Sequence, residues 1–245
     1  SAKLNILTVK DTKSKAVFCY PCSSKSPSAG VAAQVVEDLE ILGYNRIALR
    51  CDNEPSIKKL QELIVNTRKH ETIPQNSPTY SSQSNGAAER AVQSVTGHIR
   101  VTKFALEQRI GKDIPADWAV LQWLVIFAGM MLTCHEIGHD GRTAYFRFHG
   151  RQANFAVAEF GEQVFYRLPR ARSGRLRKLQ SVWFPGTWLG ISRRSHEYIV
   201  ATEDGTVVKA RSIRRRPLAE RWKLERVEGI KGTPACPNPQ QSDEA

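Results

Sequence analysis

The sequence predicts an α/β domain followed by a smaller module built from β-strands. Strand-type and helix-type segments alternate through the first half of the chain, which is typical of a parallel or mixed sheet covered by helices. After residue 155 only short strand-type runs remain, and Gly205 supplies hairpin chemistry between two of them. We therefore expect an α/β domain over residues 1–150, a basic module like a small SH3-like β-barrel over 151–231, and a disordered tail over 232–245.

The strands follow from alternating or continuous apolar runs that end at turn residues. Pro21, for example, stops the second run. We expect strands over residues 4–9, 16–20, 46–51, 163–166, 187–189, 198–202 and 207–210.

The helices follow from apolar residues at helical spacing and from their end signals. A helix over 29–42 ends at Gly43, and Pro55 begins an amphipathic helix over 55–66. A longer helix is expected over 85–108, with Asn85 as its N-cap.

The longest apolar run, Trp118 to Cys134, is interrupted by Gln122 and Gly129. It is at the short limit for a membrane span and has no basic flank, so a buried helix is the better interpretation. Ser1 is not an initiator methionine and no signal peptide follows it, so we interpret the chain as a piece of a longer protein.

The charge of the chain is unevenly distributed. Lys and Arg number 36 against 24 Asp and Glu, a net charge of +12, which favours a polyanionic partner such as nucleic acid. Residues 167–216 alone hold 13 basic and 3 acidic residues, a net of +10. Five cysteines without a regular spacing indicate a reducing compartment.

Two carboxylates occupy positions suited to chemistry. Asp52 follows a buried-type strand, and ligands of open α/β sheets gather at the carboxyl ends of strands. Glu89 lies near the start of the long helix, after a Ser-, Gln- and Gly-containing segment that suits a substrate-gripping loop. Thirty-six residues, 53–88, separate the two.

At these residues the sequence resembles the catalytic core of retroviral and retrotransposon integrases, of the kind found in Copia-like Pol polyproteins. The resemblance runs from Leu4 to about Phe148 and is most specific from Tyr80 to Glu89. Thr143-Ala144-Tyr145 is similar to the closing Thr-Pro-Tyr motif of the family, with Ala in place of Pro. The basic segment from Phe160 to Arg216 more weakly resembles the β-rich region that follows the core.

The resemblance implies an RNase H-like fold and an enzyme that catalyses DNA strand transfer. In the family three carboxylates hold two Mg²⁺ (or Mn²⁺) ions, and water and then a DNA 3′-hydroxyl attack a phosphodiester. Asp52 would be the second catalytic, metal-binding carboxylate and Glu89 the third. The partners would be the DNA ends of the element and the target DNA. The protein would act as a homo-oligomer in the nucleus, and no membrane partner is expected.

The first carboxylate of the family is the difficulty. Asp11 is the only acid before Glu37, but it closes a strand at a polar turn. By the resemblance, the first Asp lies on the preceding strand, upstream of Ser1, and that strand is the centre of the family's sheet. We therefore expect this chain to lack the first strand and to be inactive alone.

Further residues are expected to contact DNA. Some lie in the loop before Glu89 or on the same helix face as Glu89, and others belong to the basic segment. For the basic segment, the alternatives are a nuclear import signal at Arg214–Arg216 or an ordinary solvated surface. These residues are Tyr80, Ser84, Asn85, Gln93, Arg100, Lys103, Arg172, Arg175, Arg177, Lys178, Arg214, Arg215 and Arg216.

Two motifs offer competing interpretations. His135-Glu136-Ile137-Gly138-His139 matches the zinc-protease pattern, which requires a helix that continues through both histidines, and Gly138 argues against one. Cys19-Tyr20-Pro21-Cys22 has no second pair for zinc, and core packing explains it better. A non-catalytic DNA-binding protein that keeps the RNase H-like shell remains the main alternative.

Overall fold

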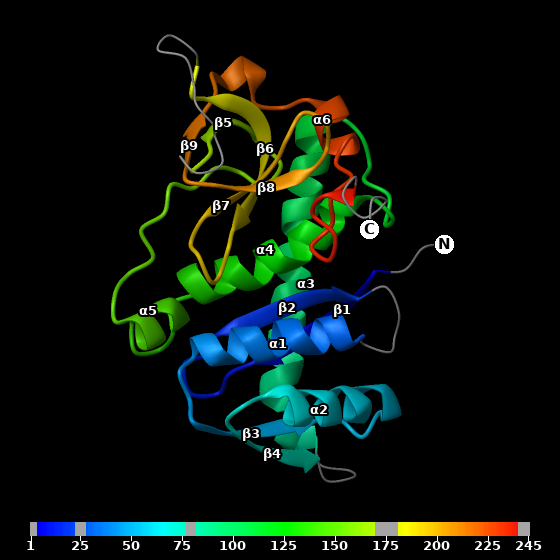
Figure 1. Ribbon diagram of the computed structural model, residues 1–245, viewed down its shortest axis with the longest axis vertical. Coiled ribbons are helices and arrows are strands. Elements are labelled where there is room, and N and C mark those ends of the chain that lie inside the picture. The colour runs from blue at the N-terminus through cyan, green and yellow to red at the C-terminus, as the bar shows by residue number, and fades with distance from the viewer. Residues whose placement is uncertain (1–3, 23–27, 77–81, 170–180, 240–245) are drawn as a thin grey trace. The chain divides into compact units, whose positions relative to one another are not determined.

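The computed structural model describes residues 4–22, 28–76, 82–169 and 181–239 (Figure 1). Its elements, in chain order, are β1 (Asn5–Lys10), β2 (Val17–Cys22), α1 (Ala29–Ile41), β3 (Arg46–Cys51), α2 (Pro55–Thr67), β4 (Glu71–Asn76), α3 (Ser82–Ile110), α4 (Ala119–His135), α5 (Ala144–His149), β5 (Gln163–Arg167), β6 (Phe184–Ile191), β7 (Tyr198–Ala201), β8 (Val207–Ala210), β9 (Ser212–Arg215), a short 3₁₀ turn (Leu218–Glu220) and α6 (Leu224–Glu228).

The chain divides into two compact units. One, here called the α/β unit, comprises Leu4–Gly97 and Ala128–Ala153; the other, the β unit, comprises His98–Phe127 and Asn154–Ala245, with Ser1–Lys3. Two of the boundaries between the units fall inside helices: one lies between Gly97 and His98 in α3, and the other between Phe127 and Ala128 in α4. The division differs from the predicted cut at residue 150 because two long helices contribute residues to both units.

The strands of the α/β unit form two separate pairs within the described residues. Strands β1 and β2 are an antiparallel hairpin, and β3 and β4 are parallel, as the crossover through α2 requires. The structure is thus a mixed α/β arrangement, as predicted, but the single mixed sheet that the sequence suggested is present as two halves.

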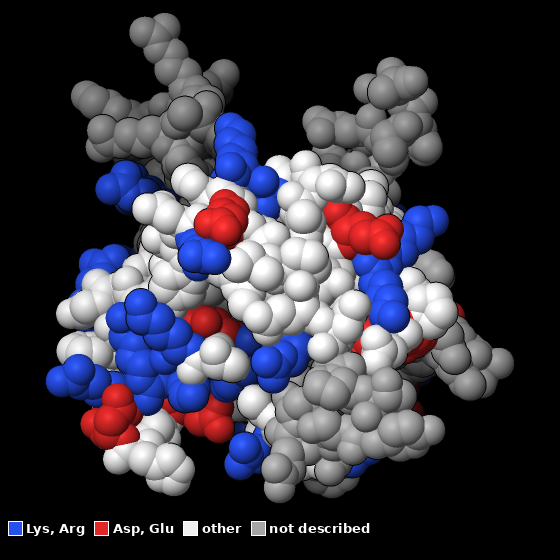
Figure 2. Space-filling model, turned by 90° about the horizontal axis from the view of Figure 1, so that it is seen from below, with Lys and Arg blue, Asp and Glu red and all other residues white. Residues whose placement is uncertain are grey.

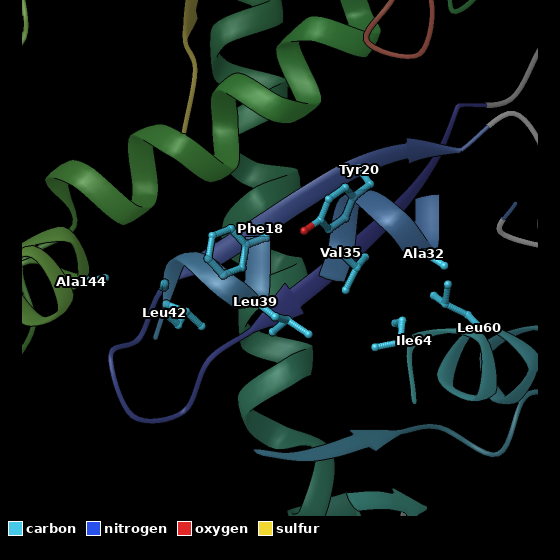
Figure 3. Close-up of a cluster of buried hydrophobic side chains, with 10 residues drawn as sticks. Phe18, Tyr20, Ala32, Val35, Leu39, Leu42, Leu60, Ile64 and Ala144 are labelled. Carbon is cyan, nitrogen blue, oxygen red and sulfur yellow. The ribbon is translucent and has the colours of Figure 1, made fainter. Parts of the chain in front are cut away.

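A hydrophobic core joins the elements of this unit. Strand β2 contributes Phe18 and Tyr20, helix α1 contributes Val35 and Leu39, and α2 adds residues from its own buried face (Figure 3). Helix α1 begins at a Ser28 cap and ends before Gly43, whose φ of +71° favours glycine. The predicted amphipathic pattern of residues 29–42 therefore places its apolar stripe on the hairpin.

The fully buried side chain of Arg68, at the end of α2, fastens four segments together. Its Nη1 donates to the Glu71 carbonyl at 3.1 Å, its Nη2 donates to the Tyr44 carbonyl, and its Nε lies 3.1 Å from the Glu40 carboxylate. A planar guanidinium with several fixed donors suits such a junction. Arg68 therefore ties the ends of α1 and α2 to the starts of β3 and β4.

The β unit contains a five-stranded antiparallel sheet in the order β8-β7-β6-β5-β9. In the described residues β8 and β9 are its two edges, so the sheet is open and the expected closed barrel is not formed. Trp188 of β6 is fully buried, and its ring meets Phe127 of α4 edge-on at 5.5 Å, which fixes the sheet against the part of α4 in this unit.

The segment 232–239, predicted to be a disordered tail, is held by hydrogen bonds. Trp123 Nε1 donates to the Gly232 carbonyl at 2.8 Å, and the Val207 amide donates to the Pro237 carbonyl at 2.8 Å. Hydrogen bonds from Trp123 and Val207 therefore order this segment, although its amino-acid composition predicts disorder. Residues 240–245 lie outside the described part of the chain.

Helix α4 carries the long apolar run and is buried along most of its length, as expected. Thr133 bonds both the amide and the carbonyl of Val17 in β2, at 2.9 and 3.0 Å, which satisfies two strand groups. None of the helices in the described residues has the length and apolar character needed to cross a bilayer.

Candidate functional site

Asp52 lies directly after β3, in the turn that leads into α2, and its side chain is exposed. Pro55 occupies the first turn of α2, where its missing N–H costs nothing. Burial and the Asp52 charge both raise the pKa of the neighbouring Cys51 thiol. The predicted position of this carboxylate at a strand's carboxyl end is therefore the observed one.

The buried side chain of Gln61 supports this end of the β3–β4 pair. Its amide donates to the Leu49 carbonyl at 2.6 Å and to the Gln75 carbonyl at 3.1 Å. These carbonyls belong to different strands, so one side chain of α2 fixes both strands near the point where Asp52 leaves the sheet. No motif marks Gln61 in the sequence, and only the tertiary contact identifies its role.

Glu89 is exposed on α3 and lies two helical turns from its first residue. The helix begins at Ser82, so Asn85 is inside it and is not the expected N-cap. The predicted DNA contacts Ser84 and Asn85 are thus placed on α3 by their backbone, and Tyr80 lies outside the described residues.

The donor set fits Mg²⁺ by ligand type, since carboxylate oxygens are the hard ligands it prefers. It is incomplete by number: among the described residues, no group of three or more His, Cys, Asp or Glu could hold a metal ion. Asp52 and Glu89 remain two candidate ligands, on separate elements of one unit.

Asp11 has a structural role in the β1–β2 turn. Its Oδ2 accepts hydrogen bonds from the Ser14 amide at 2.7 Å and from the Tyr44 hydroxyl at 2.9 Å. Burial acts to raise the pKa of Asp11, but bonds from Ser14, Tyr44 and Lys13 outweigh it and hold that pKa below its ordinary value. Burial, and then the bond to Asp11, raise the pKa of Tyr44 to about 12.

The other predicted contacts on α3 have different surroundings. Gln93 and Arg100 are exposed. Lys103 is paired with Glu107, whose carboxylate also accepts the Ile114 amide at 2.7 Å. Burial acts to raise the pKa of Glu107, yet the bonds from Ile114 and Lys103 lower it. Lys103 is therefore already paired with a carboxylate of its own helix.

The three consecutive arginines of the basic segment have three different environments. Arg214 is exposed, and its guanidinium lies 4.4 Å from the centre of the Trp183 ring. Arg215 donates two hydrogen bonds to the fully buried carboxylate of Glu162. Arg216 pairs with Glu220 at 2.5 Å. Of these, Arg214 is the one whose charge meets no carboxylate in the described residues. The predicted contacts Arg172, Arg175, Arg177 and Lys178 lie outside the described residues.

The zinc-protease motif does not lie on one helix. Helix α4 ends at His135, and Ile137 then forms a β-bridge with Thr143. His135 and His139 therefore do not follow each other along a helix face, which the motif requires.

The closing motif forms the start of α5. The Thr143 hydroxyl caps the helix by accepting the Phe146 amide at 3.1 Å, and Tyr145 is buried. Ala144 is then the first helical residue, a position where proline is favoured, so Ala for Pro is a mild exchange.

Basic side chains are also present outside the basic segment. Figure 2 shows one face of the molecule on which Lys and Arg gather along one side, with Asp and Glu among them. This face thus has mixed charge with a local basic patch.

These features define an α/β unit in which the candidate carboxylates Asp52 and Glu89 are exposed, and a β unit with a basic, aromatic sheet. No protein-family model and no curated protein match the chain in sequence. Solved structures of integrases resemble the chain, but with low sequence identity and low TM-scores. The catalytic core domain of BIV integrase has 21% identity and a TM-score of 0.40, covering 60% of this chain and 86% of that one.

Two further structures are comparable. The integrase of a simian T-cell lymphotropic virus intasome, in complex with PP2A regulatory subunit B56 gamma, has 13% identity and a TM-score of 0.44 over 87% of this chain and 73% of that one. The HTLV-2 integrase catalytic core domain in complex with magnesium, in a trimeric form, has 15% identity and a TM-score of 0.41 over 60% and 93%. These similarities are too low to assign a family, so function is inferred from the chain's own residues.

Proposed function

We propose that the chain is part of a retroelement integrase of the Copia-like kind, acting in DNA strand transfer. The observation that carries the proposal is the pair Asp52 and Glu89, one at a strand's carboxyl end and one on helix α3, which begins within the Tyr80–Glu89 motif. Both residues are exposed. The intact protein would be a homo-oligomer that joins element ends to target DNA in the nucleus.

On this proposal Asp52 and Glu89 hold divalent metal ions, Mg²⁺ or Mn²⁺. Two bound ions would stabilise the attacking and leaving oxygens of an in-line displacement. Gln61 keeps the strand end that carries Asp52 in place, and the rigid helix α3 carries Glu89. Gln93 lies one turn beyond Glu89, where it can reach a phosphate of the bound strand.

We further propose that the intact RNase H-like domain has one more strand, between β1 and β3, with the third carboxylate on it. The residues of β1 are only half-buried whereas those of β2 are almost all buried. Leu7 and Val9 of β1 and Ile47 and Leu49 of β3 border the same core cluster. A strand paired with both would join the two half-sheets and bring a carboxylate beside Asp52. On this proposal strand transfer requires that strand and its carboxylate.

The test compares this chain with a longer protein that includes residues preceding Ser1. We expect no strand transfer to DNA ends by the present chain with Mg²⁺ or Mn²⁺, and activity in the longer protein that Asp52→Asn or Glu89→Gln abolishes. Hydrogen exchange supplies a second readout, since the amides of β1 and β3 should become protected in the longer protein. Activity of the present chain that Asp11→Asn abolishes would overturn the assignment of the first carboxylate.

The second candidate function is non-catalytic DNA binding by the same shell. It is favoured by the incomplete carboxylate set in the described residues and by the unneutralised Arg214. A longer protein that gains protection at β1 and β3 and binds DNA, yet transfers no strand, would support this alternative.

A further inference from the structure

One face of the five-stranded sheet combines aromatic rings and arginines in register. Phe165 of β5 is the partner of Pro185 on one neighbouring strand and of Arg214 on the other, so the three side chains share a face. Trp183 precedes Pro185 by two residues, and Arg216 follows Arg214 by two. We call these five residues, Phe165, Trp183, Pro185, Arg214 and Arg216, the aromatic–arginine face.

The opposite face of the same strands is the packed one. Val164, Tyr166 and Ile213 are 0%, 6% and 9% exposed, whereas the five residues of the aromatic–arginine face are half-buried or exposed. Arg215 also lies on the packed side, next to Val164 in register and bonded to Glu162. Arg214 and Arg215 therefore lie on opposite faces of β9, and Arg215 is the one that pairs with the buried carboxylate of Glu162.

Both arginines of the aromatic–arginine face lie over aromatic rings. The Arg214 guanidinium is 4.4 Å from the Trp183 ring centre, and that of Arg216 is 4.8 Å from the ring centre of Phe165. Glu220 neutralises Arg216, but Arg214 meets no carboxylate among the described residues. The face thus offers stacked planar groups and one uncompensated positive charge.

This chemistry suits unpaired nucleotides. Bases of a single strand stack on aromatic rings and guanidinium planes while the backbone follows positive charge. In a duplex the bases are stacked on one another, so a protein meets only phosphates and the edges of the bases in the grooves. Charged, flexible side chains can bind these groups, and aromatic rings are not needed. Phe165 and Arg214 are paired in the sheet, and Trp183 and Arg216 are stacked against them, so little entropy is lost on binding.

We propose that the aromatic–arginine face binds single-stranded nucleic acid by base stacking, in preference to duplex. The inference deepens the nucleic-acid binding that the proposed function requires, and it assigns the binding to unpaired bases and to Arg214 and Trp183. It requires neither Asp52 nor Glu89.

The experiment measures binding of the 245-residue chain to a labelled oligothymidylate of about 12 nucleotides, a length within single-strand site sizes. A duplex of the same length and an oligouridylate are the comparison probes. We expect the single strands to bind more tightly than the duplex, and the DNA and RNA arms distinguish the sugar preferred.

The decisive variants separate charge from stacking. Arg214→Ala should weaken oligothymidylate binding by about tenfold, in the range found for loss of one stacked base. Arg214→Lys keeps the charge but loses the plane, so affinity should still fall while its salt dependence stays that of the wild type. Trp183→Ala should weaken binding similarly, and Trp183→Phe should restore most of it.

Arg46→Ala, which removes an exposed charge from the α/β unit, is the matched control and should bind nearly as the wild type. Wild-type affinity in Arg214→Lys, or a duplex that binds as tightly as the single strand, would overturn the inference. The strand-transfer assay of the longer protein separates the two proposals, because it depends on Asp52 and Glu89, whereas the preference for single strands depends on the aromatic–arginine face. Strand transfer with no preference for single strands would sink this inference and leave the proposed function standing.

Discussion

The guanidinium of Arg215 donates hydrogen bonds of 2.8 and 2.7 Å to the carboxylate of Glu162, whose side chain is completely buried. Arg221 approaches the same carboxylate at 3.3 Å. The Glu162 carboxylate also accepts the Glu159 amide at 3.0 Å, so its negative charge is fully compensated. An arginine within a basic run is therefore part of the structural framework of the β unit.

Arg215→Ala should lower the free energy of unfolding by about 3 kcal/mol, because it leaves a buried carboxylate with one cationic partner fewer. Arg214→Ala, one residue away, should change it by less than about 0.5 kcal/mol, as is usual for exposed positions. Urea denaturation followed by fluorescence measures both. Equal effects at the two positions would contradict the division of roles along β9.

Asp11→Asn should destabilise the chain by about 1 to 2 kcal/mol at neutral pH, through weaker bonds to Ser14 and Tyr44. The pKa of Asp11 is lowered in the folded state, so the charged form contributes stability above its ordinary pKa of 3.8 and that contribution is lost as the pH falls through the folded value. Denaturation at several pH values should show the wild type and the variant converging below about pH 4. A difference that stays constant into acid would mean that the charge of Asp11 is unimportant.

Two helical glycines should respond to alanine with opposite signs. A Cβ at Gly129 of α4 would lie 2.9 Å from Cys19 Sγ and 3.1 Å from the Cys19 amide nitrogen, so Gly129→Ala should cost about 1 to 3 kcal/mol by overpacking. At Gly97 of α3 a Cβ would meet nothing within 4 Å, so Gly97→Ala should stabilise by about 0.5 to 1 kcal/mol. Thermal unfolding of the two variants compares them directly.

Gln61→Leu should cost about 1 to 3 kcal/mol, because it leaves two strand carbonyls without their donor. Glu62→Gln, at the exposed neighbouring position, is the control and should be nearly neutral. Hydrogen exchange should localise the effect to β3 and β4. In the longer protein of the proposed function, the Gln61 variant should also lose strand transfer, because the strand end that carries Asp52 is no longer held.

The elements that the sequence predicts well have strong local patterns. Residues 46–51 form β3 as expected, and the helix predicted over 55–66 is α2. Strand β4 was not predicted, because it contains Pro74 and one apolar residue and owes its conformation to parallel pairing with β3. Strand β9 was missed similarly, since Ser212–Arg215 is an edge strand rich in arginine.

The candidate site is predictable only where a motif marks it. Asp52 and Glu89 could be placed from strand and helix patterns, but Gln61 could not, because its partners are known only once the strands are assembled. The same limit explains Arg214–Arg216, which are equivalent in the sequence. Glu162, which sets Arg215 apart, lies 53 residues away along the chain.

The separation of β1–β2 from β3–β4 has a consequence for handling the protein. An unpaired strand is a template for association with other chains, and charged side chains on it oppose such pairing. Arg46 and Arg50 are exposed on β3, and docking a second chain there would strip water from both. Neutralising the two arginines together should therefore make the protein form more fibrils or precipitate on concentration than the wild type does, which light scattering would detect.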